Sequence, residues 1–236
     1  MKSIRPFALA LLAAALGSFS SVGAQTPTGT PPPATNAQLF EQAGWILAMR
    51  SQVGDLNLSA TELACLQRGI AAAAANRPPL LDPAQAGPQL EQLIGGRLAA
   101  KKAVAVQAGK AAADRLFAGL KHNPRVVALP SGLCYEILRP GTGAFPKATD
   151  VVEVHYTGTL PNGHVFDSSI SRGQPAKFSL NQVIRGWTEG VQKISVGGKI
   201  RLYVPAALAY GDNPPGGIPP ASALLFDVEL LRIAAK

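Results

Sequence analysis

The chain has 236 residues, of which 47% are hydrophobic and 15% are charged. This composition is that of a globular protein, and it excludes both a disordered chain and a protein with several membrane spans. The formal net charge is +8, but no dense run of Lys and Arg occurs, so nucleic acid is not an expected partner.

Residues 1–24 have the pattern of a secretory signal peptide. Lys2 and Arg5 precede an apolar run over 7–16, and small residues end the segment at 22–24. The apolar run is too short to span a bilayer comfortably, although an uncleaved anchor is the alternative that the pattern leaves open. We therefore expect a periplasmic or otherwise exported protein without stable membrane insertion.

A proline-rich leader over 25–36 precedes a helical region over 37–125. Two capping boxes mark helix starts: one joins Thr35 to Gln38, and the other joins Ser59 to Glu62. The helix over 37–50 carries more apolar residues than one short helix needs, which predicts a homodimer.

A third helix is predicted from Pro88 to Leu120. Larger apolar residues gather at its two ends, whereas the alanine-rich middle can bury little. This pattern favours a long rod anchored at both ends, and a packed helix in a small bundle is the alternative.

The region 126–236 changes to an alternation of period two, which is typical of strands. Strands are predicted over 133–139, 151–157, 199–204 and 223–233, with a short helical segment after Arg185. The pair Asn162-Gly163 indicates a tight hairpin turn. Cys65 and Cys134 fall in different predicted domains, so we expect no bond between them.

No motif for nucleophilic, phosphate-binding or dinucleotide chemistry occurs in the chain. The histidines are His122, His155 and His164, and no third ligand accompanies the last two, so neither a metal nor another cofactor is expected. Several aromatic residues instead fall near predicted loops. Each alone is better explained as core, but together they can line one apolar cup.

Three stretches carry a family resemblance: "VHYTGTLPNGHVFDSS", "VIRGWTEGVQKISVGGKIRLYVP" and "AYGDNPPGGIPPASALLFDVELL". Over 128–234 the chain resembles the FKBP-type peptidyl-prolyl cis/trans isomerases. The piece "LSATELACLQRGI" is similar to the dimerisation region of exported bacterial members, the macrophage-infectivity-potentiator group. The resemblance implies an α+β fold: an all-α dimerisation region with one long helix, then an antiparallel sheet of five or six strands curled around a short helix.

The resemblance also implies a site. Its catalytic positions are Tyr156, Phe166, Asp167, Trp187, Tyr210 and Phe226, and its substrate-binding positions are Val183, Ile184 and Ile218. In the family the tryptophan forms the pocket floor, while the backbone N–H of Ile184 and the hydroxyl of Tyr210 would hold ligand carbonyls. Asp167 either orients the substrate or accepts a hydrogen bond from Tyr156.

Two departures from the animal members concern a macrolide inhibitor, which the resemblance makes a possible ligand. Ala176 stands where those members have a phenylalanine wall, and the loop after Tyr210 is one residue shorter than theirs. Both changes affect how well a macrolide fits, and neither affects the fold.

The resemblance implies a peptidyl-prolyl isomerase that acts on proline-containing unfolded or folding polypeptides. A dry aromatic cup can favour the twisted amide without any nucleophile, so the lack of a catalytic triad agrees with this function. The alternative is a periplasmic holdase-type chaperone in which the isomerase domain is secondary. An immunophilin without catalysis is a third, weaker hypothesis.

Overall fold

The computed structural model describes residues 34–234, so the predicted signal peptide and most of the proline-rich leader lie outside the described residues. The chain divides into two compact units, one ending at Ser51 and one beginning at Gln52. Within residues 34–234, no helix is long and apolar enough to cross a membrane.

The first unit contains helix α2 (Asn36–Arg50). It begins where the sequence predicts, because Thr35 accepts a hydrogen bond from the Gln38 N–H and the Gln38 side chain accepts one from the Thr35 N–H. No residue of α2 is buried within its own chain.

The second unit opens with the 3₁₀ turn η1 (Val53–Leu56) and helix α3 (Ala60–Ala74). The predicted capping box of Ser59 and Glu62 is present at the start of α3. Glu62 also forms an ion pair with Arg97 of the next helix. The hydrogen bond from Arg97 is the main reason that the pKa of Glu62 falls to about 2.

Helix α4 (Pro83–Leu120) is longer than predicted. It begins at Pro83 rather than Pro88, because Asp82 caps the N–H of Ala84 and Pro83 occupies the first helical position. The expectation for its alanine-rich middle was wrong at Gly109, which is buried against the backbone of Pro220 and Ala221.

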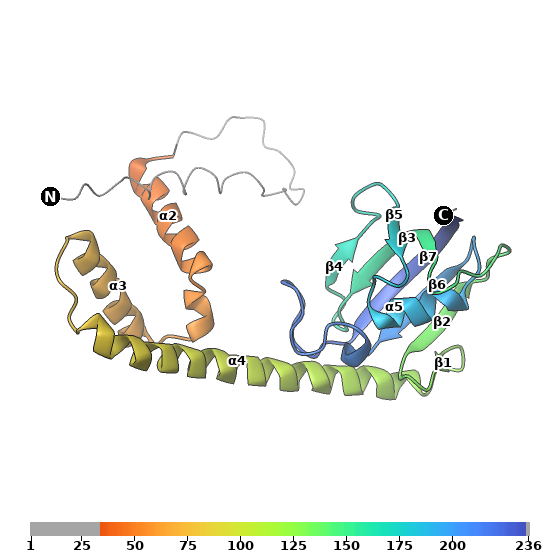
Figure 1. The fold of residues 1–236 in the computed structure, drawn as a ribbon, viewed down its shortest axis with the longest axis horizontal. Helices are drawn as coiled ribbons and strands as arrows, with labels where there is room; N and C mark the ends of the chain where they lie inside the picture. Colours follow the sequence, from red (N-terminus) through yellow and green to blue (C-terminus); the bar gives the residue numbers. More distant parts are fainter. Residues whose placement is uncertain (1–33, 235–236) are drawn as a thin grey trace. The chain divides into compact units, whose positions relative to one another are not determined.

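Within residues 34–234, seven strands form one antiparallel sheet in the order β1-β2-β6-β7-β3-β4, and β5 pairs with β3 on the same side as β4 (Figure 1). The strands are β1 (Val127–Ala128), β2 (Cys134–Arg139), β3 (Val151–Thr159), β4 (Val165–Ser168), β5 (Ala176–Ser179), β6 (Lys199–Val204) and β7 (Leu224–Ala234). The four strands predicted from period-two alternation are confirmed as β2, β3, β6 and β7 within two residues at each end. The expectation of five or six strands missed the shortest elements.

The core of this half lies between the sheet and helix α5 (Arg185–Gly190), which crosses one face of the sheet (Figure 1). Alternate residues of β7 are buried from Leu224 to Leu230, as the sequence pattern predicts. The hairpin between β3 and β4 turns at Gly163, which has a φ of 86°. Its left-handed backbone explains the glycine after Asn162.

Candidate active site

Helix α5 is seated on strand β6 by a close approach at Gly186. A Cβ atom there would lie 2.3 Å from Cγ1 of Val204, so only glycine allows the helix to lie this near the sheet. The first turn is held by the Ile184 carbonyl, which accepts from the Trp187 N–H at 2.9 Å and from the Thr188 N–H at 3.2 Å. This seating brings the Trp187 indole into the core.

Trp187 is 4% exposed and is surrounded by three aromatic rings. The ring centroids of Tyr156 and Phe226 each lie 5.3 Å from it and that of Phe178 lies 5.4 Å from it, all three edge-to-face. Such edge-to-face pairs are the favoured arrangement of aromatic rings. The indole Nε1 is buried and has no hydrogen-bond partner among the described residues.

A cavity of about 320 Å³ opens above this cluster. Its lining residues are Tyr156, Phe166, Asp167, Phe178, Gln182, Val183, Ile184, Trp187, Tyr210 and Phe226. Eight of the nine predicted site residues therefore lie around one cavity, although they come from β3, β4, α5, β7 and two loops.

Ile218 is the predicted residue that does not line this cavity; it is half-buried and packs against the core. Ala176 also packs against the core, and the aromatic side chain contributed by β5 comes from Phe178 instead. Phe178 and Gln182 were missed from the sequence. Phe178 stands two residues after Ala176 and thus on the same face of β5, which is the signal that could have revealed it.

The charged edge of the cavity is a three-residue cluster. The Tyr156 hydroxyl donates to the Asp167 carboxylate, and the Arg172 guanidinium donates both to Asp167 and, at 3.0 Å, to the Tyr156 hydroxyl oxygen. Arg172 was also missed from the sequence. It lies on the loop between β4 and β5, whose path the sequence did not predict.

This cluster sets the protonation states of its members. Burial by itself would raise the pKa of Asp167, but the hydrogen bonds from Tyr156 and Arg172 outweigh it and the pKa is lowered. Burial and the hydrogen bond to Asp167 raise the pKa of Tyr156. Both oxygens of the Asp167 carboxylate are occupied, one by Tyr156 and one by Arg172, so the geometry favours the role of orienting Tyr156.

Two donors remain available to a ligand. Among residues 34–234, no group accepts a hydrogen bond from the Ile184 N–H, and none accepts one from the Tyr210 hydroxyl. Tyr210 is 41% exposed at the cavity rim. A carbonyl oxygen of a bound peptide can therefore be held at either position without displacing an existing bond.

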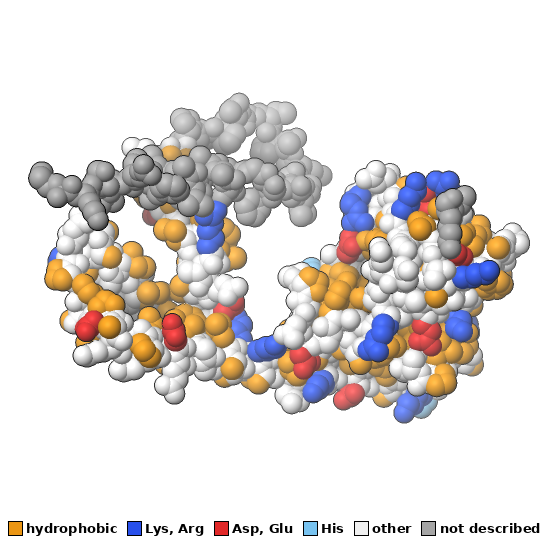
Figure 2. Space-filling model, viewed as in Figure 1, with side chains coloured by type: hydrophobic (Ala, Val, Ile, Leu, Met, Phe, Trp, Pro, Cys, Tyr) orange, Lys and Arg blue, Asp and Glu red, His pale blue; other side chains and the backbone are white. Residues whose placement is uncertain are grey.

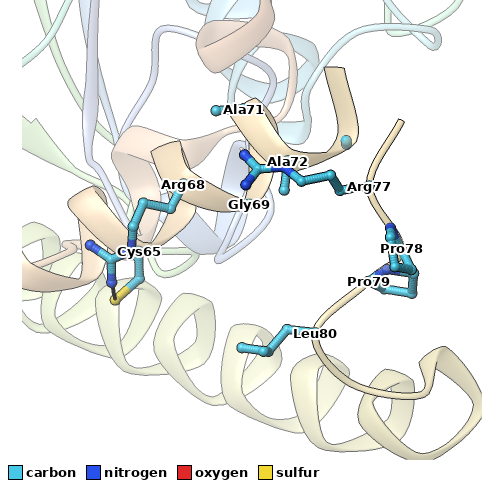
Figure 3. A pocket seen from close by; sticks show the side chains of 10 residues that line it. Cys65, Arg68, Gly69, Ala71, Ala72, Arg77, Pro78, Pro79 and Leu80 are labelled. Atoms are coloured by element: carbon cyan, nitrogen blue, oxygen red, sulfur yellow. Dashed lines mark hydrogen bonds between the residues drawn. The ribbon is translucent and has the colours of Figure 1, made fainter. Parts of the chain in front are cut away.

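A larger hollow, of about 750 Å³, lies at α3 and the loop that follows it (Figure 3). Arg68, Gly69, Pro79 and Leu80 are among its lining residues, and Arg68 Nη2 lies 3.0 Å from the Sγ of Cys65. It is lined by no aromatic residue, whereas the smaller cavity is lined by six. The smaller cavity is therefore the candidate site for an apolar ring such as that of proline.

In the part of the chain that the structure describes, no group of three His, Cys, Asp or Glu residues is placed so that it could hold a metal ion. His155 is half-buried, and its Nδ1 lies 3.2 Å from the Ser169 hydroxyl. Its ring thus pairs with a hydroxyl across the β3–β4 hairpin.

Comparison with known families agrees with this geometry. Residues 142–231 match the model described as FKBP-type peptidyl-prolyl cis-trans isomerase, and residues 41–137 match the domain amino-terminal to it. The chain belongs to the FKBP-type peptidyl-prolyl cis-trans isomerase family. The crystal structure of FkpA from Escherichia coli superposes with a TM-score of 0.66 at 34% identity, covering 84% of this chain and 97% of that one.

Curated relatives share higher identity over shorter stretches. FkpA from Aeromonas hydrophila is 54% identical over 129 residues, which cover 55% of this chain and 48% of the relative. A probable FKBP-type isomerase from Haemophilus influenzae is 47% identical over 151 residues, 62% of this chain and 63% of the relative. The outer membrane protein MIP from Legionella longbeachae is 46% identical over 125 residues, 52% of this chain and 54% of the relative. The matched parts thus span about half to two thirds of the length of these relatives.

Proposed function

We propose that this chain catalyses the cis-trans isomerisation of X–Pro bonds in polypeptide substrates. The observation that carries the proposal is the aromatic cavity, which has a buried Trp187 floor and two unoccupied hydrogen-bond donors at its wall and rim. The cavity is large enough for a proline ring and its flanking carbonyl groups.

The proposed catalysis follows from the electronic change in the amide. Planar amide resonance separates charge between the carbonyl oxygen and the nitrogen, and it sets a rotation barrier of about 18–20 kcal/mol. Water stabilises the planar, charge-separated form better than the twisted transition state. A cavity that excludes water removes this advantage of the ground state.

The cavity can also bind the twisted form preferentially. The proline ring would lie on Trp187 and between Tyr156 and Phe226, while the Ile184 N–H and the Tyr210 hydroxyl hold carbonyl oxygens. Because these donors are fixed on the protein, they can favour the carbonyl orientation reached during rotation over the planar one. No proton transfer or covalent step is needed.

The test is an isomerisation assay with a proline-containing tetrapeptide. The first-order rate constant of cis-to-trans conversion should rise linearly with the concentration of purified protein. A rate equal to the uncatalysed rate at every protein concentration would contradict the proposal. Adding a macrolide to the same assay measures whether the Ala176 wall and the shorter loop after Tyr210 still admit that inhibitor.

We further propose that the chain forms a homodimer through its helical region. Helix α2 buries no residue in its own chain, and large apolar side chains on it are exposed: Phe40 is 78% exposed and Met49 is 60% exposed. A helix of 15 residues is marginal in water without tertiary packing, so this apolar surface requires a partner. Hydrophobic side chains also reach the surface on α3 and the start of α4 (Figure 2).

Light scattering after size exclusion tests the dimer. Phe40→Glu places a charge on the apolar surface of α2 and should shift the mass toward that of a monomer. Gln42→Glu adds the same charge at an exposed polar position of the same helix and should not. A monomeric parent protein, or equal masses for both variants, would contradict the proposed interface.

Export from the cytoplasm is proposed on the pattern of residues 1–24. Expression of the full chain in a bacterium, followed by fractionation and N-terminal sequencing, should recover a periplasmic protein that starts at Gln25. Recovery of the intact chain in the cytoplasm would contradict this proposal.

A further inference from the structure

Helix α4 makes a backbone-to-backbone contact at Gly109. An added Cβ atom at this position would lie 2.2 Å from the carbonyl oxygen of Pro220 and 3.0 Å from the carbonyl carbon of Ala221. Gly109 is also the buried residue of this helix. Because atoms of the backbone cannot move aside as a side chain can, only glycine fits here without a shift of the helix or of the segment that it contacts.

A second contact lies two helical turns earlier on the same face of α4. Lys102 Nζ donates to Asn213 Oδ1 at 2.5 Å, and residues seven apart lie nearly above one another on a helix. The two contacts reach both ends of one segment, residues 211–221, which we call the rim segment. Lys102 is exposed, so Gly109 makes the better-defined contact of the two.

The rim segment is joined directly to the cavity. Tyr210, which lines the cavity, immediately precedes it. At the other end, the Ala221 N–H donates to the Gly211 carbonyl at 2.9 Å, so the two ends of the segment are tied together. The path from α4 to Tyr210 therefore consists of one packing contact, one hydrogen bond and one peptide bond.

The backbone of Ala221 shows that this path is under constraint. Ala221 has a φ of 55° and is 4% exposed, so a buried alanine occupies the left-handed region that disfavours a Cβ atom. A conformation of this kind persists only where its surroundings hold it. The surroundings here are the hydrogen bond to Gly211 on one side and Gly109 of α4 on the other.

We propose that Gly109 is a positioning residue for substrate binding. Its packing contact with the backbone of Pro220 and Ala221 holds the rim segment in the conformation that places Tyr210 at the cavity. This inference rests on the proposed isomerase function. The proposal gives helix α4 a role in shaping the isomerase site. A side chain added at position 109 would displace Tyr210 through the rim segment, without contacting the substrate.

The test compares Gly109→Ala with Gly119→Ala in the full-length protein. Both replace a glycine of α4 by alanine, but a Cβ atom at position 119 meets nothing within 4 Å. Gly109→Ala should raise KM for a proline-containing peptide about three- to tenfold, the range expected for loss of one neutral hydrogen bond. Gly119→Ala should leave KM unchanged.

Hydrogen exchange of the rim segment gives a readout that needs no activity. The amide of Ala221 should exchange faster in Gly109→Ala than in the parent protein or in Gly119→Ala. Faster exchange with an unchanged KM would overturn the positioning role, and so would a raised KM with unchanged exchange. If the parent protein fails to isomerise the peptide, the proposed function fails instead, while the exchange data still decide whether α4 holds the rim segment.

Discussion

Replacement of Trp187 by phenylalanine separates the two roles that this residue combines, core packing and pocket floor. The smaller ring has two fewer carbon atoms and lacks the indole nitrogen, and the loss of the two carbons costs about 1.6 kcal/mol at about 0.8 kcal/mol for each CH₂-sized group. The change also removes the buried Nε1–H, which has no partner among the described residues. Removing such an unsatisfied donor returns about 1–3 kcal/mol.

The lost apolar contact lowers the free energy of unfolding, and the removal of the unpaired N–H raises it by a similar amount. We therefore expect the free energy of unfolding of Trp187→Phe to lie within about 1 kcal/mol of the parent value, whereas Trp187→Ala should cost about 3–5 kcal/mol. With the smaller phenylalanine ring at position 187, the base of the cavity contacts less of the proline ring. A loss of about 1.4 kcal/mol of transition-state contact corresponds to a roughly tenfold lower kcat/KM.

The measurements are urea unfolding and the tetrapeptide assay on the same preparations. Trp45→Phe is the matched control, because Trp45 is 53% exposed on α2 and lies in the other compact unit. It should leave kcat/KM for a short peptide unchanged. A stable Trp187→Phe protein with the parent kcat/KM would refute the assignment of this cavity as the active site. A destabilisation of Trp187→Phe as large as that of Trp187→Ala would refute the reasoning about the unpaired indole N–H.

Three further predictions concern the residues around the cavity and the helices. Phe178→Leu removes a ring that packs on Tyr156 and Trp187, so it should lower the free energy of unfolding by about 1–2 kcal/mol and also lower kcat/KM. The control is Phe145→Leu, at a position that is 62% exposed, which should change neither quantity in the same assays. Because the pKa of Asp167 is lowered in the folded state, its carboxylate stabilises the fold above the unfolded pKa, and this stabilisation disappears as pH falls through the folded pKa. The free energy of unfolding of Asp167→Asn, measured in urea, should therefore lack this acid dependence. An Asn variant with the parent's acid profile would show that Asp167 is not the titrating group. The stabilisation from Glu62 is likewise present above its usual pKa of 4.5 and lost as pH falls toward about 2, so helical circular dichroism of Glu62→Gln should differ from the parent at neutral pH and converge with it near pH 2.

The strands were predictable because the alternation of buried and exposed side chains leaves a signature in the sequence. Alternation along β7 marks the buried face that includes Phe226 and Val228, and the structure confirms it. The cavity residues were reached through the family resemblance, since they come from segments that no local pattern joins. Their meeting at one place depends on strand pairing, above all of β3 with β7.

The residues that were missed share a different physical property. Phe178 lies on a strand of four residues, which is too short for alternation to be distinguished from chance. The position of the Arg172 side chain depends on the path of the loop between β4 and β5. Its partners Tyr156 and Asp167 lie on the strands β3 and β4. The start of α4 was misplaced although Asp82 followed by Pro83 is a recognisable beginning of a helix.

Gly109 illustrates why burial was misjudged in the middle of α4. Apolar patterning detects faces that bury large side chains, and the stretch around Gly109 has few of them. A contact between two backbones needs the opposite, which is the absence of a side chain. Gly95, Gly96 and Gly119 of the same helix face open space, so composition alone does not distinguish a glycine that permits contact from one that merely lowers helix propensity.

The charged cluster at the cavity edge is better suited to fixing shape than to moving protons. A general acid or base needs a pKa near the working pH, but the pKa of Asp167 is lowered and that of Tyr156 is raised, so both groups move away from neutrality. Burial and the hydrogen bond to Asp167 raise the pKa of Tyr156, whereas the hydrogen bonds from Tyr156 and Arg172 lower the pKa of Asp167 against the opposing effect of burial. Arg172 then occupies the second carboxylate oxygen and fixes the Tyr156 ring, which packs edge-to-face on Trp187. The ionic contacts thereby hold in place an aromatic wall whose own part in the proposed catalysis is apolar.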